Sequence, residues 1–415
     1  MPSDAPPSPS STEVNALADR LAQDMRRRWN AGDRVATEDF VAAHPALRDH
    51  PGAIGELIYE EVSLRREHGE PGGSSEVLRR FPQWATQLRV MLELRDALEA
   101  DGPPAFPEPG ERLGEFRLLA ELGRGSRGRV YLARQPALAD RPVVVKVSSR
   151  ADAEHLSLAR LQHTHIVPLY AAQDDPARGL RVLCMPYFGG TTLAHVLAKL
   201  APIPPADRTV AGVWAAILAE PPSAIPVTAP PMPSRWSAMD YTGLIAHFGA
   251  CLADALQFAH DRGLIHMDVK PSNILLTADG QPMLLDFHLA RPLVRGGEPA
   301  PARLGGTAAY GAPEQRAALV AVRSGQRISV AVDCRADAHA LGVVLYEALA
   351  GRFPSPGVPA FRYNPRVSVG LSDIVARCLA PDPAARYPDA AALADDLRRH
   401  LAALPLRGVR NRSLA

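Results

Sequence analysis

The sequence predicts an α+β chain in which a small all-helical module precedes a larger unit that is β-rich first and helical afterwards. Three observations predict this class. Between residues 13 and 100, apolar residues recur at three- and four-residue spacing, as in amphipathic helices. Short β-type runs follow from residue 116, and long helical patterns return from residue 241. A length of 415 residues agrees with more than one folded unit.

Composition excludes several classes of protein. Apolar residues make up 47% and charged residues 22%, as in globular proteins with a core. With 46 basic and 45 acidic residues, we expect neither a nucleic-acid partner nor a polybasic membrane binder. No run of about 18 apolar residues predicts a membrane span, and residues 1–12 lack the features of a secretory signal. Four widely spaced cysteines without C-x-x-C predict reduced thiols and a cytoplasmic location.

The basic residues are divided unusually. Only three of the 46 are lysines, namely Lys146, Lys199 and Lys270, which leaves 43 arginines. This ratio indicates a preference for arginine wherever a positive charge alone suffices, so a lysine inside a motif needs a further reason.

The first hundred residues contain a tail and a helical module. Residues 1–12 are rich in proline and serine, which predicts a disordered tail. Residues 13–100 contain a weak repeat: Thr37 to Pro45 returns 37 residues later as Ser74 to Pro82, each copy with a hydroxyl N-cap candidate and acids in the first turn. Nothing there suggests chemistry, so we expect a regulatory or docking module that binds a protein partner.

Proline marks two further segments. Residues 101–112 are rich in proline and glycine and predict a linker. Residues 201–236 contain nine prolines, which favours a mostly unstructured insertion. The alternative is that the apolar patch from Val213 to Leu218 forms one or two helical turns that dock on the domain.

A glycine-rich motif opens the β-rich part. Gly123, Gly125 and Gly128 form G-x-G-x-x-G-x-V, with Leu122 before it and Val130 at its end. Such glycines let backbone approach phosphate closely. The same glycines could mark a Rossmann turn, but that turn needs a helix directly after the last glycine. The residues after Gly128 have a strand pattern, which favours a hairpin over phosphates.

A lysine ends the apolar strand that follows. Lys146 comes after three valines, and a buried ammonium group needs a partner. Glu154 follows on a helical pattern and is the candidate partner. The alternative is a lysine whose ammonium group reaches water at the sheet edge.

The strongest pattern runs from His266 to Asn273, His-Met-Asp-Val-Lys-Pro-Ser-Asn, and a short apolar strand follows it. Together with the glycine motif, Lys146, Glu154 and the later Asp286, it resembles the bacterial protein serine/threonine kinases of the eukaryotic-like type. The resemblance covers residues 116–401. It implies a two-lobed protein kinase fold preceded by the helical module.

The resemblance also implies domain limits. The kinase domain would span residues 113–402, with an N-lobe of residues 113–186 and a C-lobe of residues 187–402 that contains the insertion 201–236, and a basic tail of residues 403–415 would follow.

ATP with Mg²⁺, or with Mn²⁺ as an alternative metal, is the implied cofactor. The residues implied to contact the nucleotide are Leu122, Gly123, Gly125, Gly128 and Val130 over the phosphates, Lys146 oriented by Glu154, and Met185, Pro186 and Phe188 around adenine. Proline is acceptable at 186 because only its carbonyl is needed.

The implied transfer goes to Ser/Thr hydroxyls of a protein substrate. Asp268 would accept the hydroxyl proton, Lys270 would reach the γ-phosphate, and Thr307 would bind both of them. Asn273 and Asp286 would hold the metal.

Three further residues resemble parts of the kinase architecture rather than its chemistry. Glu314 would pair with Arg386 in a buried ion pair. Asp337 would hold the catalytic loop from a neighbouring helix.

Two residues depart from the family pattern. Met267 replaces an arginine that binds a phosphorylated activation loop, and residues 287–306 contain no Ser, Thr or Tyr. We therefore expect activity without activation-loop phosphorylation. His288 replaces a glycine, which predicts either a segment locked in its active conformation or impaired metal binding. The alternative function is a pseudokinase that acts as an ATP-binding scaffold, favoured by both residues and by the short stretch before Glu154.

Overall fold

The structure is a computed structural model that divides the chain into two compact units, residues 1–104 and 105–415, and each is described by itself. The described residues are 18, 21–22, 24–29, 32–47, isolated positions between 54 and 82, 106–125, 128–149, 154–219, 231–290, 306–307, 309–323, 328 and 331–410.

Most described residues of the first unit are helical, and residues 32–36 form the turn and extended segment before its helix α2 (Thr37–Ala43). Helix α2 leads into a 3-10 turn, Pro45–Leu47. The predicted hydroxyl cap is wrong here, because Ala36 is the N-cap and Asp39 accepts from its backbone N–H (2.8 Å). The Thr37 hydroxyl instead donates to the buried carboxylate of Glu61 (2.7 Å). Of the second copy of the repeat, residues 76 and 79–82 are described, and its hydroxyl cap candidates at 74 and 75 lie outside the described residues.

Glu61 joins the two copies of the repeat. It accepts from the backbone N–H of Thr37 (2.8 Å) and from Arg80 Nη1 (2.7 Å). Burial raises the pKa of Glu61, but Arg80 and Thr37 outweigh burial and lower it below its usual value. An ionised carboxylate that is almost fully buried therefore holds this unit together.

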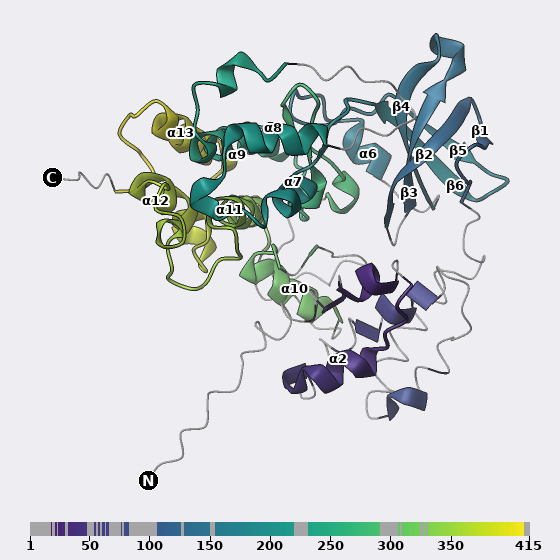
Figure 1. Ribbon diagram of the computed structural model, residues 1–415, viewed down its shortest axis with the longest axis horizontal. Helices are drawn as coiled ribbons and strands as arrows, with labels where there is room; N and C mark the ends of the chain where they lie inside the picture. Colours follow the sequence, from purple (N-terminus) through teal and green to yellow (C-terminus); the bar gives the residue numbers. More distant parts are fainter. Residues whose placement is uncertain are drawn as a thin grey trace. The chain divides into compact units, whose positions relative to one another are not determined.

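The second unit begins with an antiparallel sheet in the order β1-β2-β3-β4-β6-β5 (Figure 1). Its strands are β1 (Arg112–Leu113), β2 (Phe116–Gly125), β3 (Gly128–Gln135), β4 (Arg141–Ser149), β5 (Ala171–Asp175) and β6 (Leu180–Pro186). Val143, Val145 and Val147 alternate along β4 and are fully buried. This alternation is the reason that the valine run forms a strand with one face on a core. Helix α6 (Glu154–Leu158) lies between the sheet and the helical part (Figure 1).

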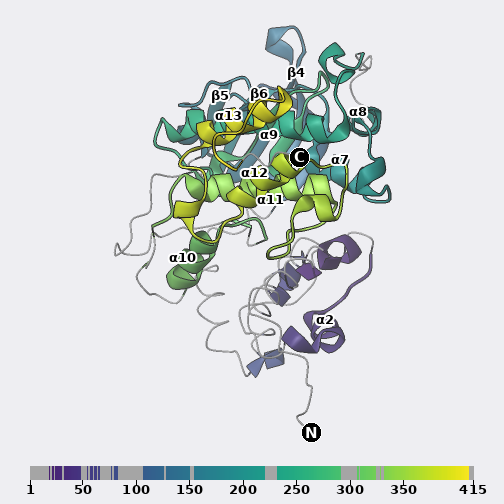
Figure 2. The same ribbon diagram turned by 90° about the vertical axis from the view of Figure 1, so that its left-hand side faces the viewer.

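Helices make up most of the remaining part, and α9, α11, α12 and α13 lie together when it is viewed from the helical side (Figure 2). The helices are α7 (Leu193–Leu200), α8 (Val210–Leu218), α9 (Tyr241–His260), α10 (Pro313–Arg323), α11 (Arg335–Ala350), α12 (Val369–Cys378) and α13 (Ala390–Leu401). Helix α9 begins where Asp240 accepts from the Gly243 N–H (2.7 Å), which is a side-chain N-cap. A small sheet consists of β7 (Thr191–Thr192), β8 (Ile274–Leu276) and β9 (Pro282–Leu284), and β8 begins directly after the catalytic loop, residues 266–273.

The prediction of a mostly unstructured insertion is wrong for its described residues. Thr209 caps α8 by accepting from the Gly212 N–H (3.1 Å), and no proline interrupts the helix. Val213 and Ile217 of α8 are buried in the main core, as the docking alternative predicted. The prolines flank the helix, so they limit its length without preventing it.

Trp236 anchors the other end of the insertion. Its ring is fully buried and makes edge contacts with Trp214 and Phe248, both with centroids 5.5 Å away. It also packs on the turn between β8 and β9, where a Cβ added to Gly280 would lie 2.7 Å from Trp236 Cζ2. Gly280 has φ +79°, so both space and backbone conformation require glycine there.

Candidate active site

The glycine motif forms a hairpin, as predicted, between strands β2 and β3. Gly125 pairs with Gly128 across its end, and β3 continues directly from Gly128 without a helix. A Cβ at Gly128 would lie 2.2 Å from the carbonyl oxygen of Val147 on β4. A Cβ at Gly123 would meet no atom within 4 Å. Gly128 is therefore needed for strand packing, whereas Gly123 leaves open space above the sheet.

The hairpin contacts residues 106–108, which precede the predicted kinase domain. The buried hydroxyl of Tyr131 on β3 donates to Pro107 O (2.7 Å). Arg129, beside the glycines, donates to Glu108 (2.9 Å) and lies over the ring of Phe106 (5.3 Å). These contacts place residues 106–108 against Arg129 and Tyr131 of the hairpin strand β3.

Lys146 lies between two carboxylates. Its Nζ donates to Glu154 Oε2 and to Asp286 Oδ1, each at 2.6 Å. Burial lowers the pKa of Lys146, but the charges of Asp286 and Glu154 outweigh burial and raise the pKa above its usual value. The ammonium group therefore stays charged, and the alternative of a lysine whose only partner is water is wrong. Glu154 is the first described residue of the short helix α6, so that helix still supplies the partner.

Asp268 is the centre of a second cluster. Its Oδ1 accepts from the backbone N–H and from the hydroxyl of Thr307 (both 2.9 Å), and its Oδ2 lies 2.8 Å from Lys270 Nζ. Lys270 Nζ also donates to the Thr307 hydroxyl (2.7 Å). Burial raises the pKa of Asp268, but Lys270 and Thr307 outweigh burial and lower it. The carboxylate is therefore ionised and can accept a proton.

Asn273 and Asp286 are the two residues predicted to hold the metal, and each has a side-chain oxygen that can bind it. The amide nitrogen of Asn273 donates to Asp268 O (2.9 Å) and Oδ2 (3.1 Å), which directs its oxygen elsewhere. The backbone links the two clusters, because the Leu285 N–H donates to Asn273 O (2.9 Å). One carboxylate and one amide oxygen are the hard ligands that suit Mg²⁺, which takes its other ligands from water and phosphate. The residues fit this metal.

His288 lies in a 3-10 turn, Phe287–Leu289, directly after Asp286. A 3-10 turn uses negative φ, which histidine adopts without strain. The left-handed residue of this segment is Asp286, with φ 64°. The positive φ of this segment is therefore at Asp286, and a 3-10 conformation does not require one of His288.

The catalytic loop is held by Asp337 on α11. This carboxylate, 1% exposed, accepts from the backbone N–H groups of His266 (2.8 Å) and Met267 (2.9 Å). His260 Nε2 lies 2.8 Å from the same carboxylate. The His266 ring contacts Leu285 O (2.9 Å), which ties the loop to the segment before Asp286. The role expected of Asp337 thus has a geometric basis.

Glu314 and Arg386 form a two-pronged ion pair, with N–O distances of 2.7 and 2.8 Å. Both side chains are buried. Arg386 also donates to the carbonyls of Ala380 (2.8 Å), Arg335 (3.0 Å) and Pro381 (3.1 Å). The pair therefore joins the start of α10 to the loop before α13.

An apolar cluster lies at the end of β6. Met185, 8% exposed, clusters with Val167 and Met283, and Val144 and Leu275 pack against them. Val144 pairs with Met185 across β4 and β6, and Val143 pairs with Pro186. Phe188 is 37% exposed. Val144 and Leu275 were missed from the sequence, although the apolar run that contains Leu275 was the available signal.

Comparison with known proteins identifies the family. Residues 237–397 match the family described as protein kinase domain. The serine/threonine-protein kinase PknB of Mycobacterium tuberculosis strain H37Rv is 30% identical over 322 residues, which cover 70% of this chain and 44% of that protein. The chain belongs to the bacterial serine/threonine protein kinases.

This kinase also resembles the serine/threonine-protein kinase Pkn1 of Myxococcus xanthus, with 30% identity over 333 residues that cover 71% of the chain and 40% of that protein. The kinase thus spans less than half the length of these two relatives. The crystal structure of the Mycobacterium tuberculosis PknI kinase domain aligns with a TM-score of 0.46 and 23% identity, over 71% of this chain and 99% of that one. Within the described residues, this kinase has no helix that is both long and apolar enough to cross a membrane.

Proposed function

We propose that this kinase transfers the γ-phosphoryl group of Mg-ATP to Ser/Thr hydroxyls of protein substrates in bacterial signalling. The observation that carries the proposal is the cluster of Asp268, Lys270 and Thr307. An ionised carboxylate, an ammonium group and a hydroxyl lie within hydrogen-bond distance of one another. That arrangement can orient an acceptor hydroxyl and stabilise charge on a transferred phosphoryl group.

In this mechanism the chain's own groups do the positioning. Asp268 accepts the hydrogen bond of the acceptor hydroxyl, and Lys270 offsets negative charge at the γ-phosphate. Lys146, oriented by Glu154, binds the α- and β-phosphates beneath the glycine hairpin. Mg²⁺, when bound by Asn273 and Asp286, neutralises charge on the phosphate oxygens. The adenine ring would pack on the apolar cluster around Met185 and hydrogen-bond to Pro186 O and Phe188 N–H.

The observations that favoured a pseudokinase lose much of their force. The short α6 still brings Glu154 to Lys146 at 2.6 Å, and His288 lies in a 3-10 turn, which does not require a positive φ of it. We infer an active enzyme rather than a scaffold.

The test is label transfer by the full chain with labelled ATP, Mg²⁺ and myelin basic protein as a general acceptor. Wild type is expected to label the acceptor, and an Asp268→Asn variant is the control because it keeps the size of the side chain while removing its charge. Equal labelling by wild type and the Asp268→Asn variant would leave the pseudokinase as the better description.

We further propose that activity does not depend on activation-loop phosphorylation. Met267, where the family has arginine, is 3% exposed. Its side chain packs in an apolar cluster that includes Ile265, Ala312 and Ile328. A thioether in such surroundings cannot bind phosphate. The buried side chain of Met267 and its apolar neighbours therefore take the place of an arginine that would bind phosphate.

Phosphatase treatment is accordingly expected to leave the rate of phosphoryl transfer unchanged. The full chain would be treated with a broad-specificity phosphatase, checked by mass spectrometry for complete removal of phosphate, and assayed against a mock-treated sample. A rate that falls after treatment and returns on autophosphorylation would contradict this prediction.

Other expectations stand as parts of the proposal. We infer that residues 13–100 bind a protein partner, that residues 101–112 link this module to a kinase domain of residues 113–402, and that the protein acts in the cytoplasm. The buried Glu61–Arg80 contact supports a folded module before the linker. A pull-down with the full chain and with a variant that lacks Arg80 would test the partner.

A further inference from the structure

The first part of the insertion packs on the C-terminal end of α11. Arg208, 6% exposed, donates from Nη1 to Ala348 O (3.2 Å) and from Nε to Ile203 O (3.2 Å). The hydroxyl of Tyr241 donates to the same Ala348 carbonyl (2.7 Å). A guanidinium group against the last carbonyls of a helix is favoured by the helix dipole. The insertion therefore contributes a cation to the end of α11.

The close fit at this contact depends on Gly351, which ends α11 with φ 70°. A Cβ at Gly351 would lie 2.7 Å from Pro205 Cγ and 3.1 Å from Arg208 Nη2. Asn364 donates both to Leu349 O (2.9 Å) and to Pro205 O (3.3 Å), which bridges the helix end and the insertion. Backbone conformation and hydrogen bonds thus hold the insertion against this turn.

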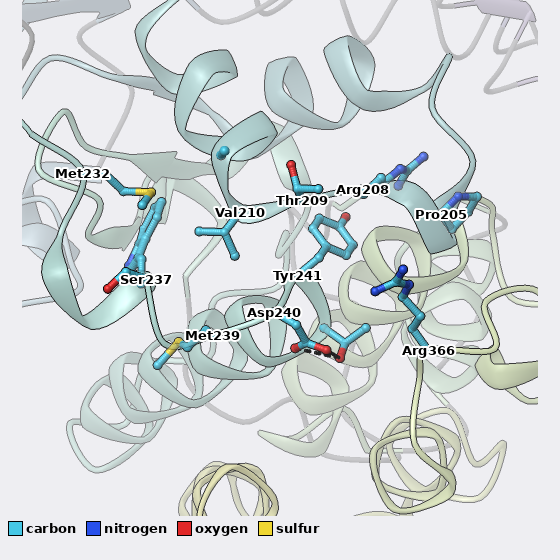
Figure 3. A pocket seen from close by; sticks show the side chains of 13 residues that line it. Pro205, Arg208, Thr209, Val210, Met232, Ser237, Met239, Asp240, Tyr241 and Arg366 are labelled. Carbon is cyan, nitrogen blue, oxygen red and sulfur yellow. Dashed lines mark hydrogen bonds between the residues drawn. The ribbon is translucent and has the colours of Figure 1, made fainter.

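A cavity of about 380 Å³ lies beside this contact (Figure 3). Arg208, Tyr241 and Arg366 all line it, and the Tyr241 hydroxyl points toward Arg208 (Figure 3). The hydrogen bonds of Arg208 go to backbone carbonyls of α11 and of the insertion. Because the cavity leaves space on one side, an unbranched side chain such as methionine fits in place of Arg208 without overpacking.

The end of α11 also holds the segment that contains Thr307. Glu347, next to Ala348, accepts from the Tyr310 hydroxyl (2.8 Å), and Phe353 lies 5.3 Å from the Tyr310 ring. The N–H groups of Tyr310 and Gly311 donate to Thr307 O (both 3.0 Å). Burial raises the pKa of Glu347, and the Tyr310 hydrogen bond and the Arg208 charge act against burial. A continuous set of contacts thus connects Arg208 to the hydroxyl that binds Asp268.

We propose that Arg208 is a positioning residue for the protein substrate. It holds the last turn of α11, and through Glu347 and Tyr310 it fixes the position of Thr307, beside which the acceptor binds. The proposal rests on the proposed function, because it names a determinant of the same reaction. These contacts do not include Lys146 or Glu154, so binding of ATP is separate from them.

The test separates the two substrates by steady-state kinetics of the full chain. Arg208→Met is expected to raise KM for myelin basic protein by about tenfold while kcat and KM for Mg-ATP stay within about twofold of wild type. Arg208→Lys, which keeps the charge at the helix end, is expected to give an intermediate KM. Arg366→Met is the matched control, because it removes an arginine that lines the same cavity and leaves α11 untouched.

Tyr241→Phe gives an independent measurement, since it removes the second hydrogen bond to Ala348 O and keeps Arg208. It is expected to raise KM for the acceptor less than Arg208→Met does, and it decides the matter if Arg208→Met does not fold. An unchanged acceptor KM in variants of normal Tm, or an equal rise in both KM values, would overturn the proposal.

Failure of the proposed function is distinguishable from failure of this inference. If wild type labels no acceptor, the proposed function is wrong. Binding of myelin basic protein would then be compared between the wild type and Arg208→Met. Tighter binding by wild type would still support the positioning role, and equal binding would reject it.

Discussion

Replacing Lys146 with arginine is expected to lower kcat of phosphoryl transfer by about 10²–10³-fold, although the positive charge is kept. The Lys146 ammonium group lies 2.6 Å from both Glu154 Oε2 and Asp286 Oδ1, and its strand β4 pairs with β3 on one side and with β6 on the other. A guanidinium group is planar and wider, and its donors diverge in a fixed fork. It cannot take the place of one small cation between two carboxylates and the phosphates. The measurement is labelling of myelin basic protein at saturating ATP.

The matched control is Lys199→Arg. Lys199 is the third lysine of the chain and lies exposed in the last turn of α7. A positive charge is all that such a position requires, so the Lys199→Arg variant is expected to have the wild-type rate. Similar losses in both variants, or no loss in either, would contradict the interpretation of the lysine count. Under that interpretation, a chain with 43 arginines keeps lysine where a compact ammonium group, rather than a planar guanidinium group, must approach phosphate.

Replacing Arg386 with methionine is expected to lower the free energy of unfolding of the second unit by about 3–5 kcal/mol. The reason is that Glu314, 6% exposed, would keep its charge in a buried place without its partner. The carbonyls that Arg386 now satisfies would also lose a donor. Urea unfolding followed by circular dichroism measures the change, provided that the transition of the second unit is resolved.

A second variant separates the effect of an unpaired buried charge from the effect of lost side-chain packing. The double variant Glu314→Met with Arg386→Met removes both charges, and it is expected to recover most of the stability because no buried charge remains. The exposed pair of Arg398 and Asp254 serves as the control, and Arg398→Ala is expected to cost less than about 1 kcal/mol. If Arg398→Ala costs as much as Arg386→Met, burial is not the cause.

The catalytic loop could be predicted from the sequence because its chemistry is local. Asp268, Lys270 and Asn273 lie within six consecutive residues, and the backbone alone brings them together. The pairing of Lys146 with Glu154 could also be predicted, because a buried ammonium group demands a nearby acid.

The contacts that hold these residues could not be predicted in the same way. His260 contacts Asp337, 77 residues away, and Tyr310 contacts Glu347, 37 residues away. No local pattern marks such partners, because they depend on how α9 and α11 pack. The folded part of the insertion stood only as the alternative prediction for another reason: the proline count describes the whole segment, whereas Thr209 caps a helix that contains no proline.

The aromatic cluster around Trp236 has a spectroscopic consequence. The chain has four tryptophans, and the two in the second unit, Trp214 and Trp236, make edge contact with each other. The indole emission of the second unit therefore originates at the junction of the insertion with α9. Replacing Trp29 and Trp84 of the first unit by phenylalanine would make fluorescence an internal reporter of whether the insertion stays docked while substrate binds.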